Sequence, residues 1–302
     1  MFKGSIPALI TPFHNGAVDW KAFENLIEWQ IEQGSHGVVP CGTTGESPTL
    51  SHDEYTAIVQ RCVDVVKKRI PVIAGTGFNN TQKTIEMTAF AKKAGADGAL
   101  IVAPYYNKPT QEGLFQHYKA VNDAVALPVI VYNIPGRSVV DIHVDTMTRL
   151  AGLPHIVGVK DATNDLARPA QLRERVGDDF CQLSGEDATF PAFLAQGGHG
   201  CISVVANVAP AEFSAMYAAW TGGDLKNFAL LRDRLAPLSR DLFCETSPAP
   251  VKYAASVLGL SSDDVRLPLV KASSAARAKV EAALAHAGLK PVKSGAAARA
   301  HG

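Results

Sequence analysis

The sequence shows no excess of either charge and no long apolar run. Lys plus Arg and Asp plus Glu each total 29 of 302 residues, so the formal charge at pH 7 is zero. Because nucleic-acid and anionic-membrane partners favour a basic excess, we expect neither. No apolar stretch approaches the roughly 20 residues of a membrane-spanning helix. Residues 1–7 lack the apolar core of a signal peptide, so we expect a cytoplasmic protein.

Cysteine is scarce, and nothing in the pattern resembles a metal site. The five cysteines are far apart, form no C-x-x-C pair and lie mostly inside apolar runs: Cys41, Cys62, Cys181, Cys201 and Cys244. The nine histidines are dispersed along the chain. We therefore expect reduced, packed thiols and no metal ion.

What the sequence does contain is a regular alternation of short apolar runs with longer amphipathic segments. The β-rich runs lie at 4–13, 36–42, 71–77, 98–105, 128–134, 156–162, 180–186 and 200–207. Eight such runs are typical of a parallel sheet buried on both faces. They predict an α/β fold, a (β/α)8 TIM barrel, which needs about 250 residues. An open doubly wound sheet is the alternative, but residues 11–16 are not its usual glycine-rich phosphate turn.

The strand pattern stops after residue 207, where helical segments are expected at 210–220, 225–238, 250–258 and 273–287. We expect residues 1–222 to form the barrel, which the first of these helices closes. Residues 223–290 are expected to form a C-terminal helical extension packed on it, and the alanine-rich residues 291–302 a disordered tail.

Residues typical of helix ends support this organisation. The hydroxyls of Ser51 and Thr81 stand where helix N-caps are expected. Gly34, Gly95 and Gly197 stand where helices end in a left-handed residue.

Lys160 is the most informative single residue. It interrupts the apolar run 156–159, and the reactive groups of a barrel collect at the carboxyl ends of its strands. Burial disfavours an ammonium group, so an inward lysine tends toward the neutral amine that attacks a carbonyl and forms a Schiff base. The alternative is a structural lysine paired with Asp161 or Asp187. The strand alone favours neither interpretation.

Other polar residues follow neighbouring strands, and each has a structural alternative. The Tyr132 phenol can shuttle protons beside a Schiff base or simply fill the barrel. Thr43 and Thr44 can cradle a small carboxylate or form a plain turn. Arg137 can clamp a second carboxylate or be an ordinary surface arginine. Each signal is weak alone, but their occurrence on successive strand ends favours a site.

Several motifs carry a resemblance that extends through almost the whole chain. They are Gly42-Thr43-Thr44-Gly45-Glu46, Ala74-Gly75-Thr76-Gly77, Pro104-Tyr105-Tyr106-Asn107-Lys108-Pro109, Tyr132-Asn133-Ile134-Pro135-Gly136-Arg137 and Gly197-Gly198-His199-Gly200. Through them the chain resembles the pyruvate-dependent class I aldolase and lyase family, which includes dihydrodipicolinate synthase and N-acetylneuraminate lyase. The resemblance implies a covalent pyruvate Schiff base without any other cofactor, and a homotetramer built as a dimer of dimers.

The resemblance also assigns catalytic roles. Lys160 would form the Schiff base with pyruvate, and Tyr132 would donate and accept protons. Thr43 and Tyr106 would complete a hydroxyl relay with Tyr132. In the family, the adjacent subunit lends the tyrosine that matches Tyr106.

Substrate contacts follow from the same resemblance. Thr44 and the backbone of Ile202 would hold pyruvate, and Gly185 would also line the substrate site. Arg137 would bind the carboxylate of a second substrate, aspartate semialdehyde. This arginine and the double threonine favour the branch that makes 4-hydroxy-tetrahydrodipicolinate, the first committed step of diaminopimelate and lysine biosynthesis. Sialic-acid lyases instead have Gly-Ser-Thr-Gly-Glu and lack the arginine.

Two alternative functions stay open. One is another pyruvate lyase or 2-oxo acid dehydratase, which would keep Lys160 and Tyr132 but take a different partner. The other is a catalytically silent keto-acid sensor, which the intact Lys160, Tyr132 and Thr43 disfavour.

The chain departs from the family pattern at a few positions. Ser138 and Val139 replace the usual Thr-Gly after Arg137, and Ser247 replaces a common asparagine, for which the sequence suggests no role.

A further departure concerns regulation by lysine. In lysine-inhibited members the effector lies among residues that match Ser47, His52, Tyr55, Asn79, Lys83 and Tyr105. A glutamate there, at the position of Lys83, receives the effector's ammonium group. Because a lysine places like charges together, we expect weak or absent inhibition.

Overall fold

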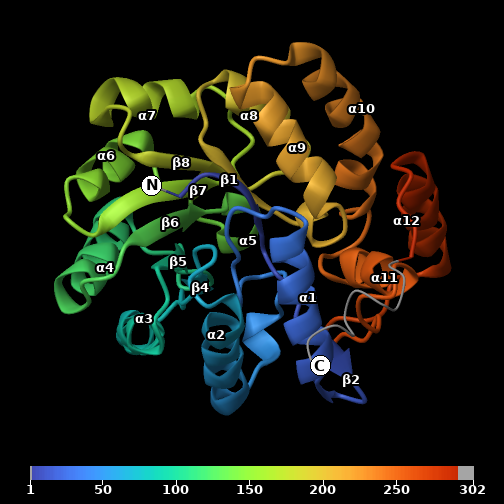
Figure 1. The fold of residues 1–302 in the computed structure, drawn as a ribbon. Coiled ribbons are helices and arrows are strands. Elements are labelled where there is room, and N and C mark those ends of the chain that lie inside the picture. Colours follow the sequence, from blue (N-terminus) through green and yellow to red (C-terminus); the bar gives the residue numbers. More distant parts are fainter. Residues whose placement is uncertain (1, 292–302) are drawn as a thin grey trace.

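A parallel β-sheet curls into a barrel with helices around it (Figure 1). The structure is a computed structural model that describes residues 2–291, so the tail predicted to be disordered lies, apart from Pro291, outside the described residues. Within that range the sheet has seven strands in the order β1-β9-β8-β7-β6-β5-β4. Their bounds are β1 Gly4–Pro7, β4 Ile73–Gly75, β5 Gly98–Val102, β6 Val129–Asn133, β7 Ile156–Asp161, β8 Cys181–Ser184 and β9 Gly200–Ser203. The predicted barrel is confirmed.

The run at 36–42, predicted to be a strand, is only a pair of bridges between β1 and β4. The Val39 N–H donates to the Pro7 carbonyl at 2.9 Å, and the Ile73 N–H donates to the Val38 carbonyl at 3.0 Å. Pro40 has no N–H to extend the ladder, and Cys41 leaves the extended region with φ of 56°. Residues 38–39 therefore fill the eighth position of the barrel without forming a regular strand.

Helices alternate with the strands as predicted. On the barrel they are α1 Trp20–Glu32, α2 His52–Val66, α3 Thr81–Ala94, α4 Gln111–Ala124, α5 Pro135–Ser138, α6 Val144–Ala151, α7 Arg168–Val176, α8 Phe190–Ala195 and α9 Pro210–Thr221, with the 3-10 turns η1 Ser47–Thr49 and η2 Val205–Asn207. An unpredicted hairpin joins β2 (Phe13–His14) to β3 (Ala17–Val18). Its turn, Asn15-Gly16, has positive φ at both residues, which is the usual chemistry of a tight hairpin.

The helix ends agree with the expected caps except at α3. Ser51 forms a capping box with Glu54 at the start of α2. Thr81 does not cap α3, because it is already helical; the side chain of Asn80 accepts the Lys83 N–H instead. Gly34, Gly95 and Gly197 have φ of 84°, 94° and 85°, as predicted for left-handed ends.

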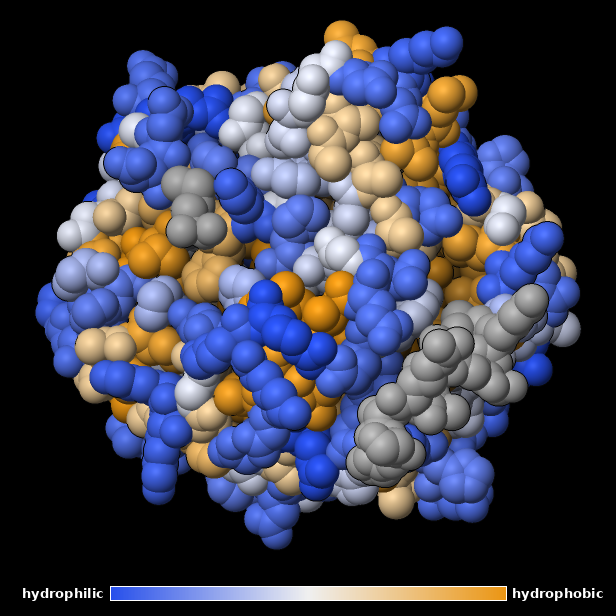
Figure 2. Space-filling model, viewed as in Figure 1, coloured by the Kyte–Doolittle hydropathy of each residue, from blue (hydrophilic) through white to orange (hydrophobic). Residues whose placement is uncertain are grey.

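The chain ends in a group of helices on one side of the barrel, beside α9 (Figure 1). These are α10 Leu225–Asp241, α11 Ala249–Val257 and α12 Ser274–His286. The face of the molecule seen in Figure 2 is largely hydrophilic, with several separate hydrophobic areas, one of them near its centre. No helix within residues 2–291 is both long and apolar enough to cross a membrane.

Alternation along each strand separates two hydrophobic clusters. On β6, Val129 and Val131 face the surrounding helices, whereas Ile130 and Tyr132 face the barrel interior. The same alternation on β7 directs Val159 outward, so Lys160 points inward beside the interior cluster. The fold therefore delivers an amine to the middle of the barrel.

Candidate active site

A cavity of about 150 Å³ lies at the carboxyl ends of the strands. Most of the predicted site residues line it: Thr43, Thr44, Tyr132, Arg137, Lys160 and Gly185. They come from five different segments between residues 43 and 185, so only the closed barrel brings them together.

Lys160 is a buried amine in this cavity. It is 6% exposed, and its Nζ lies 4.1 Å from the centre of the Tyr132 ring, directly across from it on β6. Within residues 2–291 no carboxylate lies at ion-pair distance from this amine. The site therefore holds an amine without a counterion.

The two carboxylates that could have paired with Lys160 are engaged elsewhere. Asp161 follows Lys160 on the strand and so points to the opposite face, where it accepts a 2.9 Å hydrogen bond from Arg168 Nε. Asp187 accepts from the Ser203 hydroxyl and, at 2.9 Å, from the Val204 N–H. Burial raises the pKa of Asp187. These contacts oppose the interpretation of Lys160 as a structural ion-pair lysine.

Gly185 makes room for the lysine side chain. A Cβ atom added at this position would lie 3.0 Å from Lys160 Cε and 2.7 Å from the Ala162 Cβ. The Gly185 N–H also donates to the Asp161 carbonyl at 2.6 Å, so the backbone cannot move away. Any side chain at 185 would displace the amine.

A buried ion pair holds the turn that carries Thr43 and Thr44 against helix α11. The carboxylate of Glu46, at φ of 56°, accepts from Lys252 Nζ on α11 and, at 2.9 Å, from the Arg266 N–H. Both Glu46 and Lys252 are fully buried, and burial lowers the pKa of Lys252. Thus the C-terminal helices contact the turn of the site directly.

Arg137 and Glu186 face the outer part of the same cavity. Arg137 is exposed on α5, and Glu186 is half-buried directly after β8. Burial raises the pKa of Glu186, and neighbouring Asp187 raises it further, whereas the charges of Lys160 and Arg137 act in the opposite direction. The Glu186 carboxylate has no hydrogen-bond or ion-pair partner in the described part of the chain. The cation of Arg137 and the acid of Glu186 therefore border the same cavity.

Glu186, Phe243 and Ser247 also line the cavity, although the sequence did not predict them there. For Glu186 a signal existed, because it follows Gly185 at a strand end. Phe243 and Ser247 belong to the region after the barrel, and no local pattern links them to the site. Ser247 is nevertheless buried at the cavity wall.

Two predicted residues do not line the cavity formed by residues 2–291. Tyr106 is 88% exposed and adopts a strained φ of 73°. Ile202 is buried, and its side chain belongs to the barrel interior. The hydroxyl of Tyr106 is therefore not brought to Lys160 within one chain.

The residues expected around bound lysine lie on segments from η1 to the loop after β5. Ser47 lines the cavity, His52 is exposed at the start of α2, and Lys83 is half-buried in the first turn of α3. Asn79 and Tyr105 are half-buried neighbours, since the Asn79 backbone hydrogen-bonds to Tyr105. Tyr55, which is buried, donates its hydroxyl to the Gly75 carbonyl.

No group of three or more His, Cys, Asp or Glu residues that could hold a metal ion occurs within residues 2–291. All five cysteines are free thiols. Cys41 borders the cavity, but burial raises the pKa of its thiol, which leaves it a poor nucleophile. Lys160 is thus the best-placed nucleophile at the site.

Comparison with known proteins gives consistent matches over nearly the full length. The model of the dihydrodipicolinate synthetase family matches residues 1–287. The chain is 63% identical to a 4-hydroxy-tetrahydrodipicolinate synthase from Rhodospirillum centenum, over 96% of this chain and 99% of that protein. A protein of the same name from Parvibaculum lavamentivorans is 62% identical, with the same coverage.

A solved structure gives a similar match. The chloride-inhibited dihydrodipicolinate synthase from Acinetobacter baumannii, complexed with pyruvate, has a TM-score of 0.93 to this chain. It is 47% identical, over 96% of this chain and 100% of that one.

Proposed function

The chain belongs to the dihydrodipicolinate synthetase family, and we propose that it condenses pyruvate with L-aspartate 4-semialdehyde to 4-hydroxy-tetrahydrodipicolinate. This reaction is the first committed step of diaminopimelate and lysine biosynthesis. The observation that carries the proposal is the inward amine of Lys160, which lines the cavity against Tyr132 and has no counterion within residues 2–291.

The reaction begins when the amine of Lys160, once deprotonated, attacks the ketone carbon of pyruvate. The resulting carbinolamine loses water and leaves a positively charged iminium on the lysine nitrogen. Thr44 borders the same cavity, and we assign it to hold the carboxylate of pyruvate there. The iminium is the electron sink of the reaction, so we expect no metal and no organic cofactor.

Proton transfer then falls to the hydroxyls of the site. Tyr132 is the group we assign to donate a proton to the carbinolamine oxygen and to accept one from the pyruvate methyl group, which gives the enamine. Thr43 lies on the same cavity wall and continues the relay. Because Tyr106 is exposed, its part in this relay requires a second subunit, in line with the predicted homotetramer.

The second substrate carries both a carboxylate and an ammonium group, and the cavity mouth offers a partner for each. Arg137 suits the carboxylate, and the Glu186 carboxylate suits the ammonium group. The enamine carbon attacks the aldehyde carbon, whose oxygen takes a proton and becomes the 4-hydroxyl. The substrate amine, once deprotonated, attacks the iminium carbon, and this bond closes the ring. The lysine nitrogen is then expelled, which frees Lys160.

The test is the mass of the intact protein after borohydride reduction with pyruvate, with and without aspartate semialdehyde. A single pyruvate-derived adduct on Lys160, reduced in amount when the aldehyde is turned over, supports the proposal. An adduct that the aldehyde does not affect would move the function to another pyruvate lyase. The absence of an adduct, with pyruvate still bound, would favour the keto-acid sensor.

A further inference from the structure

The loop that carries Arg137 is strained. Val139, just after α5, has φ of 66° and ψ of −22°, a left-handed conformation that β-branched residues rarely adopt. Its side chain is 64% exposed, so packing of that side chain does not offset the strain. The conformation must be imposed by the rest of the loop and by its attachments.

Inside the loop, a few hydrogen bonds hold the turn. The Val139 N–H donates to the Pro135 carbonyl at 2.9 Å. The Ser138 hydroxyl, which is buried, lies 2.9 Å from both the Ile134 and the Val140 carbonyl oxygens. These bonds shape the turn but do not attach it to the barrel.

The two ends of the loop are joined at its base. Asn133, the last residue of β6, donates to Asp141 Oδ1 at 2.7 Å, and its own side-chain oxygen accepts the Ile142 N–H at 3.1 Å. Residues 134–140 therefore form a loop that leaves the barrel at the end of β6 and returns beside Asn133. The position of Arg137 depends on this closure.

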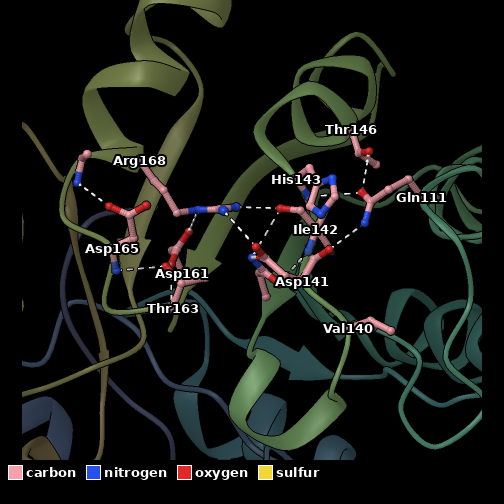
Figure 3. A network of polar contacts seen from close by, with 12 residues as sticks. Gln111, Val140, Asp141, Ile142, His143, Thr146, Asp161, Thr163, Asp165 and Arg168 are labelled. Atoms are coloured by element: carbon pink, nitrogen blue, oxygen red, sulfur yellow. Dashed lines mark hydrogen bonds and ion pairs between the residues drawn. The ribbon is translucent and has the colours of Figure 1, made fainter.

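Arg168 fixes the closed base to the strand that bears Lys160. Figure 3 shows its side chain extending from the start of α7 between Asp161 on one side and Asp141 and Ile142 on the other. Its Nε donates to Asp161 at 2.9 Å, Nη2 to the Ile142 carbonyl at 2.6 Å, and Nη1 lies 3.4 Å from Asp141. The guanidinium and Asp161 are buried, so water competes little for their contact, whereas the side chain of Asp141 is partly exposed.

We propose that Arg168 is a positioning residue that holds the strained Arg137 loop at the mouth of the cavity. This inference rests on the proposed function, in which the ligand of Arg137 is the carboxylate of aspartate semialdehyde. Within residues 2–291 the side chain of Arg168 makes polar contacts only with Asp161, Asp141 and Ile142, none of which lines the cavity, so it acts on binding through them. Without this anchor, the strain at Val139 is released by a shift of the loop, and Arg137 moves from the mouth.

The variant Arg168→Lys tests the role, because a lysine keeps the charge beside Asp161, but its donors lie on a single nitrogen atom and cannot span acceptors that now bind three separate nitrogens. We expect the KM for aspartate semialdehyde to rise about tenfold, while the KM for pyruvate and the yield of the borohydride adduct change less than about twofold. Arg175→Lys, on the same helix but paired with exposed Asp145, is the matched control and is expected to behave like the wild type.

A second substitution separates positioning from general support of the fold. Glycine adopts the left-handed region without strain, so Val139→Gly is expected to lower the KM of the Arg168→Lys enzyme at least threefold. A merely structural role of Arg168 predicts no such rescue. If Arg168→Lys does not fold, Asp141→Asn loosens the same base and is expected to give the same selective rise in KM.

Amide hydrogen exchange provides a readout that needs no substrate. Exchange within residues 135–140 is expected to accelerate about tenfold in Arg168→Lys and to stay unchanged in Arg175→Lys. Unchanged exchange, or equal rises in KM for both substrates, overturns the inference. A wild-type enzyme that traps pyruvate but does not consume aspartate semialdehyde overturns the proposed function instead, and the exchange rates still decide the role of Arg168.

Discussion

The side-chain nitrogen of Lys160 lies 4.1 Å from the centre of the Tyr132 ring, and the two residues are direct partners on neighbouring parallel strands. The register of β6 and β7 fixes this relationship, so it does not depend on a flexible loop. The ring forms a wall against which the amine rests, whereas the phenol hydroxyl is a separate chemical group. The two contributions can therefore be separated by substitution.

Tyr132→Phe keeps the wall and removes the hydroxyl. We expect the variant to fold and still to form a pyruvate adduct that borohydride traps. Turnover should fall at least about a hundredfold, because general acid–base catalysis typically contributes a hundredfold or more. The measurement is kcat for condensation beside the yield of the trapped adduct.

Tyr118→Phe is the control for the loss of a buried hydroxyl. Tyr118 is fully buried and donates to the Ile101 carbonyl at 3.0 Å, away from the cavity. Its removal should cost stability but leave kcat within about threefold. If Tyr132→Phe loses no more activity than Tyr118→Phe, the proton-transfer role of Tyr132 is wrong.

Glu186→Gln should weaken the binding of aspartate semialdehyde selectively. The amide keeps the shape of the side chain but removes the charge that we assign to the substrate ammonium group. We expect the KM for this substrate to rise about tenfold and the KM for pyruvate to stay constant. An acceptor aldehyde without the amino group should not distinguish the variant from the wild type.

The pH dependence of the same variant follows from the raised pKa of Glu186. The carboxyl binds an ammonium group only when ionised, so the wild type should lose affinity for aspartate semialdehyde as the pH falls through that raised pKa. Glu186→Gln should lack this loss. Glu174→Gln, exposed on α7, is the control, and a Glu186→Gln profile identical to it would contradict the assignment.

Much of the fold could be predicted because its signals are local. Apolar runs and cap residues determined nearly every strand and helix, and the strand ends pointed to Lys160 and Tyr132. The exceptions also have local causes: Pro40 stops a strand early, and Asn80 caps α3 in place of Thr81. Asn15-Gly16 is a typical hairpin turn, but it directly follows the apolar run 4–13, and the hairpin was therefore not predicted.

The rest of the site depends on contacts between residues far apart in the sequence. Phe243 and Ser247 reach the cavity only because the C-terminal helices pack beside it. The Glu46–Lys252 pair joins positions 206 residues apart, which no spacing rule identifies. Tyr106 requires a second chain for its predicted role, so neither the sequence nor one chain can place it.

Lysine inhibition should be weak in the wild type and stronger in Lys83→Glu. Lys83 lies in the first turn of α3, where the family resemblance puts the ammonium group of the effector. A lysine repels that group, and a glutamate attracts it. Turnover measured with millimolar lysine, before and after the substitution, checks this. Strong inhibition of the wild type would contradict the prediction.

His117 should make the protein lose stability in mild acid. Burial lowers its pKa to about 4, its Nδ1 is bonded to the Thr81 hydroxyl at 2.9 Å, and its Nε2 has no hydrogen-bond partner within residues 2–291. An unfolded chain protonates this histidine near pH 6.5, whereas the folded chain resists until about pH 4. The free energy of unfolding should therefore fall by about 3 kcal/mol between these values through His117 alone. His117→Phe cannot take up the proton, so its free energy of unfolding, measured in urea, should fall by about 3 kcal/mol less than that of the wild type between pH 7 and pH 4. If the free energies of unfolding of the two proteins fall equally over this pH range, the buried histidine is not the cause.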